Sequence, residues 1–356
     1  MAISLNAGFK LITMYKNPLN IKNFQRRDFL KLGGGIAALT AFPILSAAKP
    51  VTPEENQLGI IARPLPIIDG RFPCRIARGI WLIPDKRIPL VPNIGIIEGN
   101  DSVLVVDCGI NEVGGAYVLG AAKKIAGKRK LILTITHAHP EHTFGSQAFK
   151  GKARIFYNEL QRDYLVKNGD KLLKGFREMF GPERSYLLDN IKITPAEDVY
   201  SGSKTVIDLG NRKVVFQTWG KAHSPGDQIV SIPDEGVVFA GDLIEERKFP
   251  IVPYYPPLIE GSDIDLGKWE YALQDMADQK HRIIVPGHGN IGGNEIIQAV
   301  QQYFTSIKKL VAIHANDKKS NVELVNSLVL MIKAKNPTWE QDEFIAPAVQ
   351  YLLTKS

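Results

Sequence analysis

The chain has 356 residues, of which 44% are hydrophobic and 23% are charged, and its formal net charge is +7. This composition is typical of a folded globular protein and excludes disordered and fibrous chains. The length suits one large domain or two ordinary ones.

The N-terminal segment has the three parts of a secretory signal. The pair Arg26-Arg27 precedes an apolar run from Leu32 to Ala48, which ends in small residues, and this order is typical of a cleaved signal peptide. The arginine pair resembles a twin-arginine signal, although Gln25 stands where Ser or Thr is usual. We therefore predict that residues 1–48 are a twin-arginine-type signal peptide and that the protein is periplasmic, meeting the membrane only during export. An uncleaved membrane anchor is the alternative interpretation.

The positive charge belongs largely to that segment. Residues 1–48 hold six basic residues and one acidic residue, so their removal lowers the formal charge from +7 to +2. A nearly neutral chain gives no reason to expect nucleic-acid binding. We expect a small-molecule substrate as the partner, and the sequence leaves the oligomeric state open.

Apolar runs and helical patterns alternate along the rest of the chain. Strands are predicted at 80–83, 93–97, 102–106, 130–136, 205–207, 213–217, 228–232, 236–239 and 281–285. Helices are predicted at about 114–128, 158–181 and 265–279, and beyond Asn294 the chain is predicted to be helical with one break at Asn336-Pro337. We therefore expect one mixed α/β domain over residues 59–293 and a helical C-terminal extension over residues 294–356.

The chain has two cysteines, Cys74 and Cys108. An oxidising periplasm permits a disulfide between them, and two buried free thiols are an equally good interpretation. Neither cysteine has a partner at metal-ligand spacing, so we expect no catalytic role for either.

Three of the seven histidines lie within six residues, directly after an apolar strand. They are His137, His139 and His142, with Glu141 among them. On an extended strand end, residues i and i+2 point to the same side, so His137 and His139 can reach one metal ion. Pro140 breaks the strand, which lets Glu141 and His142 turn toward a second position. Imidazole and carboxylate ligands suit Zn²⁺, and also Fe or Mn.

The run from Thr136 to His142 resembles the THxHxDH signature of the metallo-β-lactamase superfamily. Other landmarks of that family follow in order, at residues 105–109, 221–227, 239–242 and 285–289. The resemblance covers roughly residues 60–292. It implies an α+β four-layer αββα sandwich, with the site at one edge of the two sheets.

Carried over residue by residue, the family's metal ligands fall on seven positions. The first metal would be held by His137, His139 and His223, the second by Glu141, His142 and His288, with Asp242 between the two. Asp107 would orient a histidine by accepting its second N–H, and a simple turn residue is the alternative. Asp242, Glu141 and Asp107 are the candidate catalytic residues, and one or two Zn²⁺ ions are the expected cofactor.

Glu141 departs from the family pattern, because the family has Asp at this position. The longer side chain either ligates the second metal after a small backbone shift, or withdraws and leaves that site weak or empty. A second region of interest is the loop from Glu245 to Gly261, which follows Asp242 directly. Its side chains Arg247, Phe249, Tyr254 and Tyr255 are candidates for a pocket wall, or else pack the loop against the domain.

The resemblance implies an exported hydrolase that uses a metal-bound hydroxide on an ester-, thioester- or amide-like small molecule. Within the superfamily, the chain most resembles exported quinoprotein-relay and sulfur-oxidation-associated zinc hydrolases. A class B β-lactamase is one alternative, although Asp242 stands where those enzymes have Cys or Ser. A non-enzymatic periplasmic metal-binding accessory protein is the other.

Overall fold

The computed structural model describes residues 65–68, 72–253, 263–315, 317 and 320–355. The predicted signal at 1–48 and the candidate side chains Tyr254 and Tyr255 lie outside these residues. Among the described residues, no helix is both long enough and apolar enough to cross a membrane.

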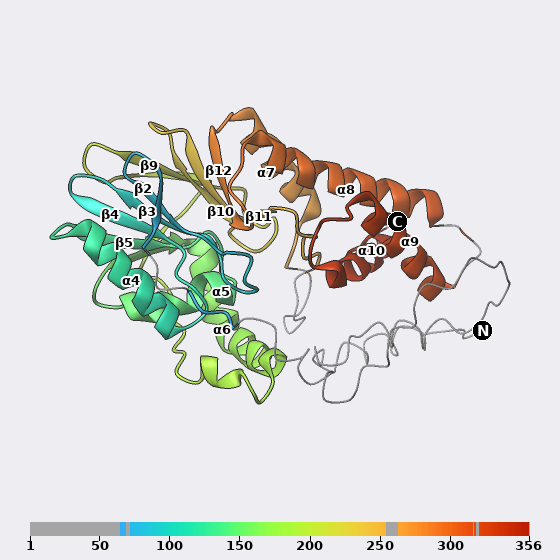
Figure 1. The fold of residues 1–356 in the computed structure, drawn as a ribbon, viewed down its shortest axis with the longest axis horizontal. Coiled ribbons are helices and arrows are strands. Elements are labelled where there is room, and N and C mark those ends of the chain that lie inside the picture. The colour runs from blue at the N-terminus through green and yellow to red at the C-terminus, as the bar shows by residue number, and fades with distance from the viewer. Residues whose placement is uncertain (1–64, 69–71, 254–262, 316, 318–319, 356) are drawn as a thin grey trace, which may run out of the picture.

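Two β-sheets lie face to face at the centre of the fold (Figure 1). The first sheet has the order β1-β2-β3-β4-β5-β6-β7 and the second has the order β12-β11-β10-β9-β8. The strands of the first sheet are β1 (Cys74–Ala77), β2 (Ile80–Ile83), β3 (Ile94–Glu98), β4 (Ser102–Val106), β5 (Lys130–Thr134), β6 (Arg154–Asn158) and β7 (Asp198–Tyr200). The strands of the second are β8 (Lys204–Asp208), β9 (Lys213–Thr218), β10 (Gln228–Ile232), β11 (Val237–Glu245) and β12 (Ile283–His288).

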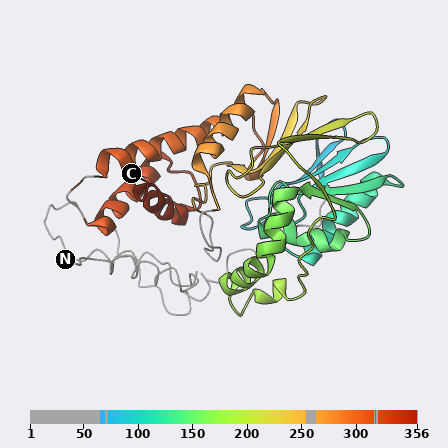
Figure 2. The same ribbon diagram turned by 180° about the vertical axis from the view of Figure 1, so that it is seen from behind.

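Helices cover the outer face of each sheet, as Figures 1 and 2 show from opposite sides. The first sheet is covered by α4 (Glu112–Ala126) and α6 (Glu159–Phe180), and the short α5 (Pro140–Thr143) follows β5. The second sheet is covered by α7 (Leu266–Asp278) and α8 (Asn294–His314), followed by α9 (Asn321–Lys335) and α10 (Ile345–Leu353). Short 3-10 turns occur at η1 (Phe144–Phe149), η2 (Ser185–Leu188) and η3 (Asp342–Phe344). The predicted αββα sandwich with C-terminal helices is confirmed.

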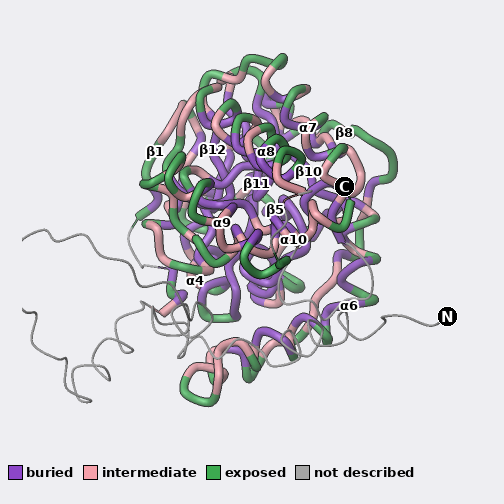
Figure 3. Tube along the Cα trace, turned by 90° about the vertical axis from the view of Figure 1, so that its right-hand side faces the viewer, coloured by how far each residue is buried: buried purple, intermediate pink, exposed green. Residues whose placement is uncertain are grey.

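Three apolar layers hold the sandwich together, and the strands divide their side chains between them. In β4, Val103 and Val105 pack with the helices, whereas Leu104 and Val106 pack between the sheets. Successive strand residues face opposite sides, so a strand covered on both faces is apolar throughout. This is why the 102–106 run has no polar alternation, and Figure 3 shows the buried residues concentrated in the centre of the fold.

The C-terminal helices belong to the same apolar layer as the second sheet. Phe304 of α8, Leu328 of α9 and Val349 of α10 are buried with Trp269 of α7 and Ile229 of β10. The described residues past Asn294 therefore pack on the sandwich and share its core.

Several predicted boundaries differ from the structure. The strands β1, β6 and β7 were not predicted, because they are short and carry charged residues at their ends. The predicted break at Asn336-Pro337 is confirmed, since α9 ends at Lys335, but the expectation of one break is wrong because an earlier one separates α8 from α9. Ser320 caps α9 in a reciprocal pair with Glu323, and this Ser-x-x-Glu pattern is the start signal that marks the earlier break.

The two cysteines are both free thiols. Cys108 is buried, and burial raises its pKa well above the usual value. Cys74 is exposed, so the interpretation of two buried thiols is wrong for this residue.

Candidate metal centre

The site begins where the parallel strands β4 and β5 end side by side, with Val106 paired to Thr134. Asp107 follows β4 with a φ of 68°, in the left-handed region that Asp tolerates better than most residues. In this conformation its carboxylate accepts hydrogen bonds from the amide of Thr136 at 2.7 Å and from the hydroxyl of Thr136 at 2.9 Å. It also contacts His142 Nδ1 at 2.9 Å. Asp107 therefore fixes the ring of His142 with Nε2 directed away from it.

Pro140 is the first residue of the one-turn helix α5. Proline suits this position because its φ is already helical and its missing N–H would have had no partner there. The chain therefore turns after His139, and Glu141 and His142 follow on the new turn. The rings of His137 and His139 lie 4.6 Å apart between centroids, and those of His137 and His142 lie 4.1 Å apart.

The remaining candidate ligands come from the second sheet. His223 lies in the connection between β9 and β10, Asp242 lies within β11, and His288 ends β12. Asp242 Oδ2 is 3.6 Å from His137 Nε2, whereas Asp242 Oδ1 is 3.3 Å from His142 Nε2 and 3.8 Å from His288 Nε2. One oxygen of this carboxylate therefore faces each half of the cluster.

A glycine lets the second sheet approach this closely. A Cβ atom at Gly287 would lie 1.8 Å from Asp242 Oδ1, a distance that no side chain tolerates. Gly287 is therefore required by the position of Asp242, since any larger residue would displace the carboxylate.

The seven predicted ligands form two groups that share Asp242. Group one is His137, His139, His223 and Asp242, and group two is Glu141, His142, Asp242 and His288. Within each group the candidate ligand atoms all lie within 4.8 Å of one another, and every residue is buried. The structure thus brings together all the residues that the sequence proposed as ligands.

Many of the polar atoms in these groups have no hydrogen-bond partner among the described residues. They include His137 Nε2, Glu141 Oε2, His142 Nε2, both ring nitrogens of His223, and Asp242 Oδ1. A buried polar atom without a partner costs about 1–3 kcal/mol, so such a concentration is expected only where something else satisfies them. Imidazole nitrogen and carboxylate oxygen are the donors that divalent metals such as zinc take, and the residues present fit two such ions.

The protonation equilibria of the histidines divide into two kinds. Burial lowers the pKa of His137 and His139 well below the usual value, and it lowers that of His288 to about 3. For the other two, burial acts in the same direction but nearby carboxylates outweigh it. Asp242 and Asp107 raise the pKa of His142 well above its usual value, and Asp227 raises that of His223 to about 9.

Burial and neighbouring charges also shift the pKa values of the carboxyl groups. Burial raises the pKa of Asp242, but His142, His288 and His137 outweigh it and hold the pKa well below the usual value. Burial raises the pKa of Glu141. Burial and the nearby Asp242 raise the pKa of Glu245 to about 8.

His223 is held more loosely than His142. Its Nδ1 is 3.5 Å from Asp227 Oδ1, and its ring packs edge-on against Trp269 at 5.1 Å between centroids. Asp227 itself accepts hydrogen bonds from the hydroxyl and the amide of Ser224, and so it shapes the connection that carries His223.

The loop after Asp242 packs mainly against the C-terminal helices. Phe249 is fully buried, with its ring 5.4 Å from that of Trp339 and 5.6 Å from that of Tyr303. Arg247 is exposed and donates to the backbone carbonyl of Thr338. Of the two interpretations of this loop, packing is therefore the correct one for Phe249.

Sequence reasoning missed three buried or half-buried neighbours of the cluster, namely Glu245, Lys248 and Gln341. None lies in a family motif, and Gln341 lies in the C-terminal extension, where no pattern linked it to the site. The two histidines outside the motifs, His281 and His314, belong to neither ligand group.

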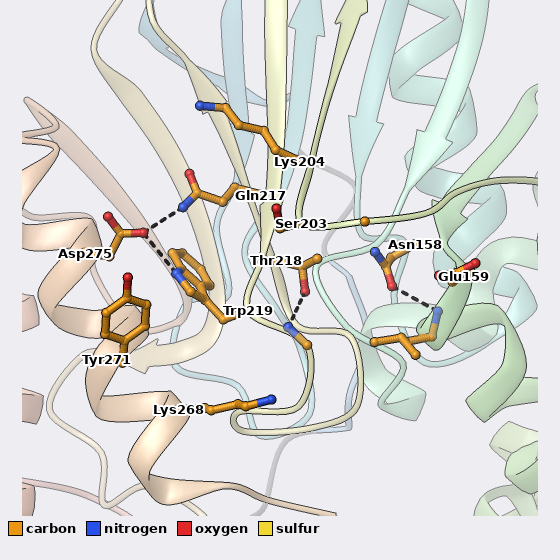
Figure 4. Close-up of a pocket in the computed structure, with 13 residues that line it drawn as sticks. Asn158, Glu159, Ser203, Lys204, Gln217, Thr218, Trp219, Lys268, Tyr271 and Asp275 are labelled. Atoms are coloured by element: carbon orange, nitrogen blue, oxygen red, sulfur yellow. Dashed lines mark hydrogen bonds between the residues drawn. The ribbon is translucent and has the colours of Figure 1, made fainter.

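A cavity of about 630 Å³ lies between β8, β9, α7 and the start of α6 (Figure 4). In it, Gln217 and Trp219 both donate to Asp275, at 2.7 and 2.9 Å. None of the seven candidate ligands lines this cavity. It therefore belongs to the flank of the second sheet and is separate from the metal centre.

Comparison with known proteins agrees with this geometry. Residues 87–288 match the family described as Metallo-beta-lactamase superfamily, a match over more than half of the chain. A curated relative, the metallo-beta-lactamase type 2 of Bacteroides fragilis, is 29% identical over 96 residues, which are 25% of this chain and 36% of the relative. The chain thus aligns with about a third of that relative's length.

The chain is also similar to solved structures, at low sequence identity. The chain is similar to a structure described as TMB-1, with 17% identity, a TM-score of 0.50, and coverage of 67% of this chain and 97% of that chain. It is also similar to a metallo-beta-lactamase from Pontibacter korlensis, with 18% identity, a TM-score of 0.49, and coverage of 65% and 96%.

Proposed function

Because the chain belongs to the metallo-beta-lactamase superfamily, we propose that it is a metal-dependent hydrolase with the two ligand groups as its active centre. The observation that carries this proposal is the pair of buried donor groups sharing Asp242. A divalent ion bound in such a site supplies a nucleophile at neutral pH by lowering the pKa of water to about 7, and it polarises the substrate oxygen.

In this proposal each side chain has a defined task. His137, His139 and His223 would hold one ion and Glu141, His142 and His288 the other, and Asp242 belongs to both groups. Asp107 orients His142 by accepting from its Nδ1. The carbonyl of Val91 accepts from His288 Nδ1 at 3.0 Å and leaves Nε2 for the metal. Such outer partners fix the tautomer and the direction of a metal-binding ring.

We further propose Zn²⁺ as the ion, since a nitrogen-rich set with carboxylates suits it. The proposed substrate is a small ester, thioester or amide. A β-lactam is a second candidate, favoured by the likeness to the Bacteroides fragilis enzyme, whereas Asp242 in place of Cys or Ser speaks against it.

The test combines metal analysis with a substrate panel. The purified mature protein should contain two equivalents of zinc and should hydrolyse at least one of a panel of esters, thioesters and nitrocefin. Hydrolysis of nitrocefin alone would favour the β-lactamase. Bound metal with no turnover of any substrate would leave the non-enzymatic metal-binding protein as the better proposal.

The role of Glu141 has its own test, which is metal stoichiometry against Glu141→Asp. In the structure Glu141 already reaches the other members of group two, so we expect two equivalents in the wild type. One equivalent in the wild type that rises to two in Glu141→Asp would show instead that the longer side chain weakens the second site.

We also propose export, supported by the arginine pair and the apolar run in residues 1–48. Fractionation of cells that express the full chain should place it in the periplasm, and Arg26→Lys with Arg27→Lys should keep it in the cytoplasm. An unchanged distribution in the double variant would contradict a twin-arginine signal.

A further inference from the structure

A third carboxylate lies beside group two, although it is not one of the seven candidate ligands. Glu245 ends β11, where it pairs in register with His288, and the next amide, that of Glu246, donates to the carbonyl of His288 at 2.8 Å. The side chain of Glu245 is buried, and the charges of Asp242, His223 and Glu141 all act on it. Its Oε1 has no hydrogen-bond partner among the described residues. Glu245 is therefore a buried acid next to both ligand groups.

The other oxygen of Glu245 is held by the C-terminal extension. With its amide oriented to satisfy its neighbours, Gln341 donates from Nε2 to Glu245 Oε2 at 3.1 Å and to the carbonyl of Phe249 at 3.3 Å. Gln341 has a φ of 67°, which is uncommon for a residue other than glycine. A residue keeps this backbone conformation only where its surroundings hold it there, and such residues are often found at functional sites.

The backbone around Gln341 is fixed to the same loop. The amide of Phe249 donates to the carbonyl of Glu340 at 2.9 Å, and the amide of Glu340 donates to the carbonyl of Arg247 at 3.0 Å. From the first sheet, Arg87 pairs with both Glu246 and Glu340 at 2.8 Å. The extension thus joins the loop that follows Asp242 through both backbone and side chains.

The net charge of the metal-loaded centre suggests a role for the carboxylate of Glu245. Two divalent ions among neutral imidazoles and two carboxylates would leave a buried excess of positive charge, and buried charge is costly unless it is compensated. Lys248 is the nearby cation. Its ammonium lies 3.8 Å from the buried Asp85, and its charge also acts on Glu245 and favours the ionised form of that acid. The carboxylate of Glu245 can therefore add negative charge beside the site and balance the metal charge.

We propose that the C-terminal extension completes the metal centre, with Gln341 holding Glu245 beside group two so that its charge strengthens metal binding there. Glu245 and Gln341 are positioning residues, since neither belongs to the two ligand groups. The inference rests on the proposed function in one respect, namely that the two groups bind divalent ions.

The test is the affinity for Zn²⁺, measured on the full mature chain by competition with a chromophoric chelator. Glu245→Gln keeps the shape and removes the charge, and it should weaken binding of the ion at group two by about 10- to 100-fold, the range known for outer partners of metal ligands. Gln341→Ala removes the amide that holds the carboxylate, and should weaken the same ion by about 10-fold. The matched control is Glu343→Gln, an exposed acid in the same turn, which should leave both affinities unchanged.

Unfolding of the metal-free variants separates this role from a merely structural one. In Gln341→Ala, the loss of zinc affinity should be larger than the change in the free energy of unfolding of the metal-free protein accounts for. Wild-type affinity in both Glu245→Gln and Gln341→Ala would overturn the inference while leaving the seven-ligand centre intact. A wild-type protein that binds no zinc would instead overturn the proposed function. If Glu245→Gln does not fold, Gln341→Ala alone decides, because its side chain is only half-buried.

Discussion

The two ligand groups share one carboxylate but are oriented in different ways. In group two, Asp107 fixes His142 at 2.9 Å and the carbonyl of Val91 fixes His288 at 3.0 Å. In group one, Asp227 is 3.5 Å from His223, and neither ring nitrogen of His223 has a hydrogen-bond partner among the described residues. Both histidines of group two are therefore held by hydrogen-bonded partners before metal arrives. In group one, the hydroxyl of Thr136 holds His137 at 3.1 Å, whereas His223 has only the longer contact to Asp227 and its ring packing on Trp269.

Asp242 belongs to both ligand groups, so its loss should have the largest effect on metal content. Asp242→Ala removes one oxygen from each group, so we expect metal content to fall from two equivalents to none and hydrolysis to fall below detection. Mass spectrometry of the purified protein gives the metal content. One retained equivalent would mean that one group binds without Asp242.

Gly287→Ala should come next, because its Cβ displaces Asp242 Oδ1 without removing it. We expect both metals to bind more weakly, with group two affected more, since Oδ1 faces His142 and His288. Gly120→Ala is the control. It lies in α4 with no heavy atom within 4 Å of the new Cβ, and it should raise stability by up to about 1 kcal/mol with metal content unchanged. Equal zinc affinities in Gly287→Ala and Gly120→Ala would contradict the inference that a Cβ at position 287 displaces Asp242.

Asp107→Asn tests how group two is oriented. Asparagine tolerates the left-handed backbone, so the change removes the charge behind His142 and keeps the turn. We expect about a 10- to 100-fold loss of affinity for one of the two ions. Asp227→Asn should weaken the other ion less, because the longer contact to His223 contributes less. Titration with zinc resolves the two ions, and a larger effect at Asp227 would reverse the comparison.

The metal-free protein should be most stable near pH 6.5. The pKa values of His137, His139 and His288 are lowered in the folded state, so below about 6.5 only the unfolded chain takes up their protons and stability falls. The pKa values of His223 and Glu245 are raised to about 9 and about 8, so the contribution of His223 is lost between about pH 6.5 and 9, and that of Glu245 between about pH 4.5 and 8. Each group changes the free energy of unfolding by at most about 1.4 kcal/mol per pH unit. Thermal unfolding from pH 5 to pH 9 with chelator present checks this, and a flat profile would contradict it.

Much of the fold could be predicted from the sequence. The strand at 102–106 is buried on both faces and is apolar after Ser102, and α6 lies between Asn158 and Gly181 as its pattern predicted. The strands β1, β6 and β7 could not be predicted, since their short, partly charged segments depend on neighbours for their extended form. The β-propensity of each segment alone does not indicate that it pairs with a neighbouring strand.

The candidate metal centre could likewise be predicted only in part. The histidine run and the later landmarks predicted all seven members of the two groups. Glu245 and Gln341 were missed because their link is tertiary: a glutamine in a short turn of the extension reaches an acid on β11. Lys248 and Asp85 are a similar case, since their proximity arises only when the first sheet meets the loop after β11.

Because each ligand group takes members from both sheets, neither group exists until the sheets have docked. The ends of β5 and β12 are far apart in the sequence, and contacts of this kind form late because closing a long loop costs entropy. Metal capture is therefore expected as one of the last events of folding, and it would trap the docked state by mass action. Zinc added during refolding should leave the early rates unchanged and slow the unfolding of the finished protein.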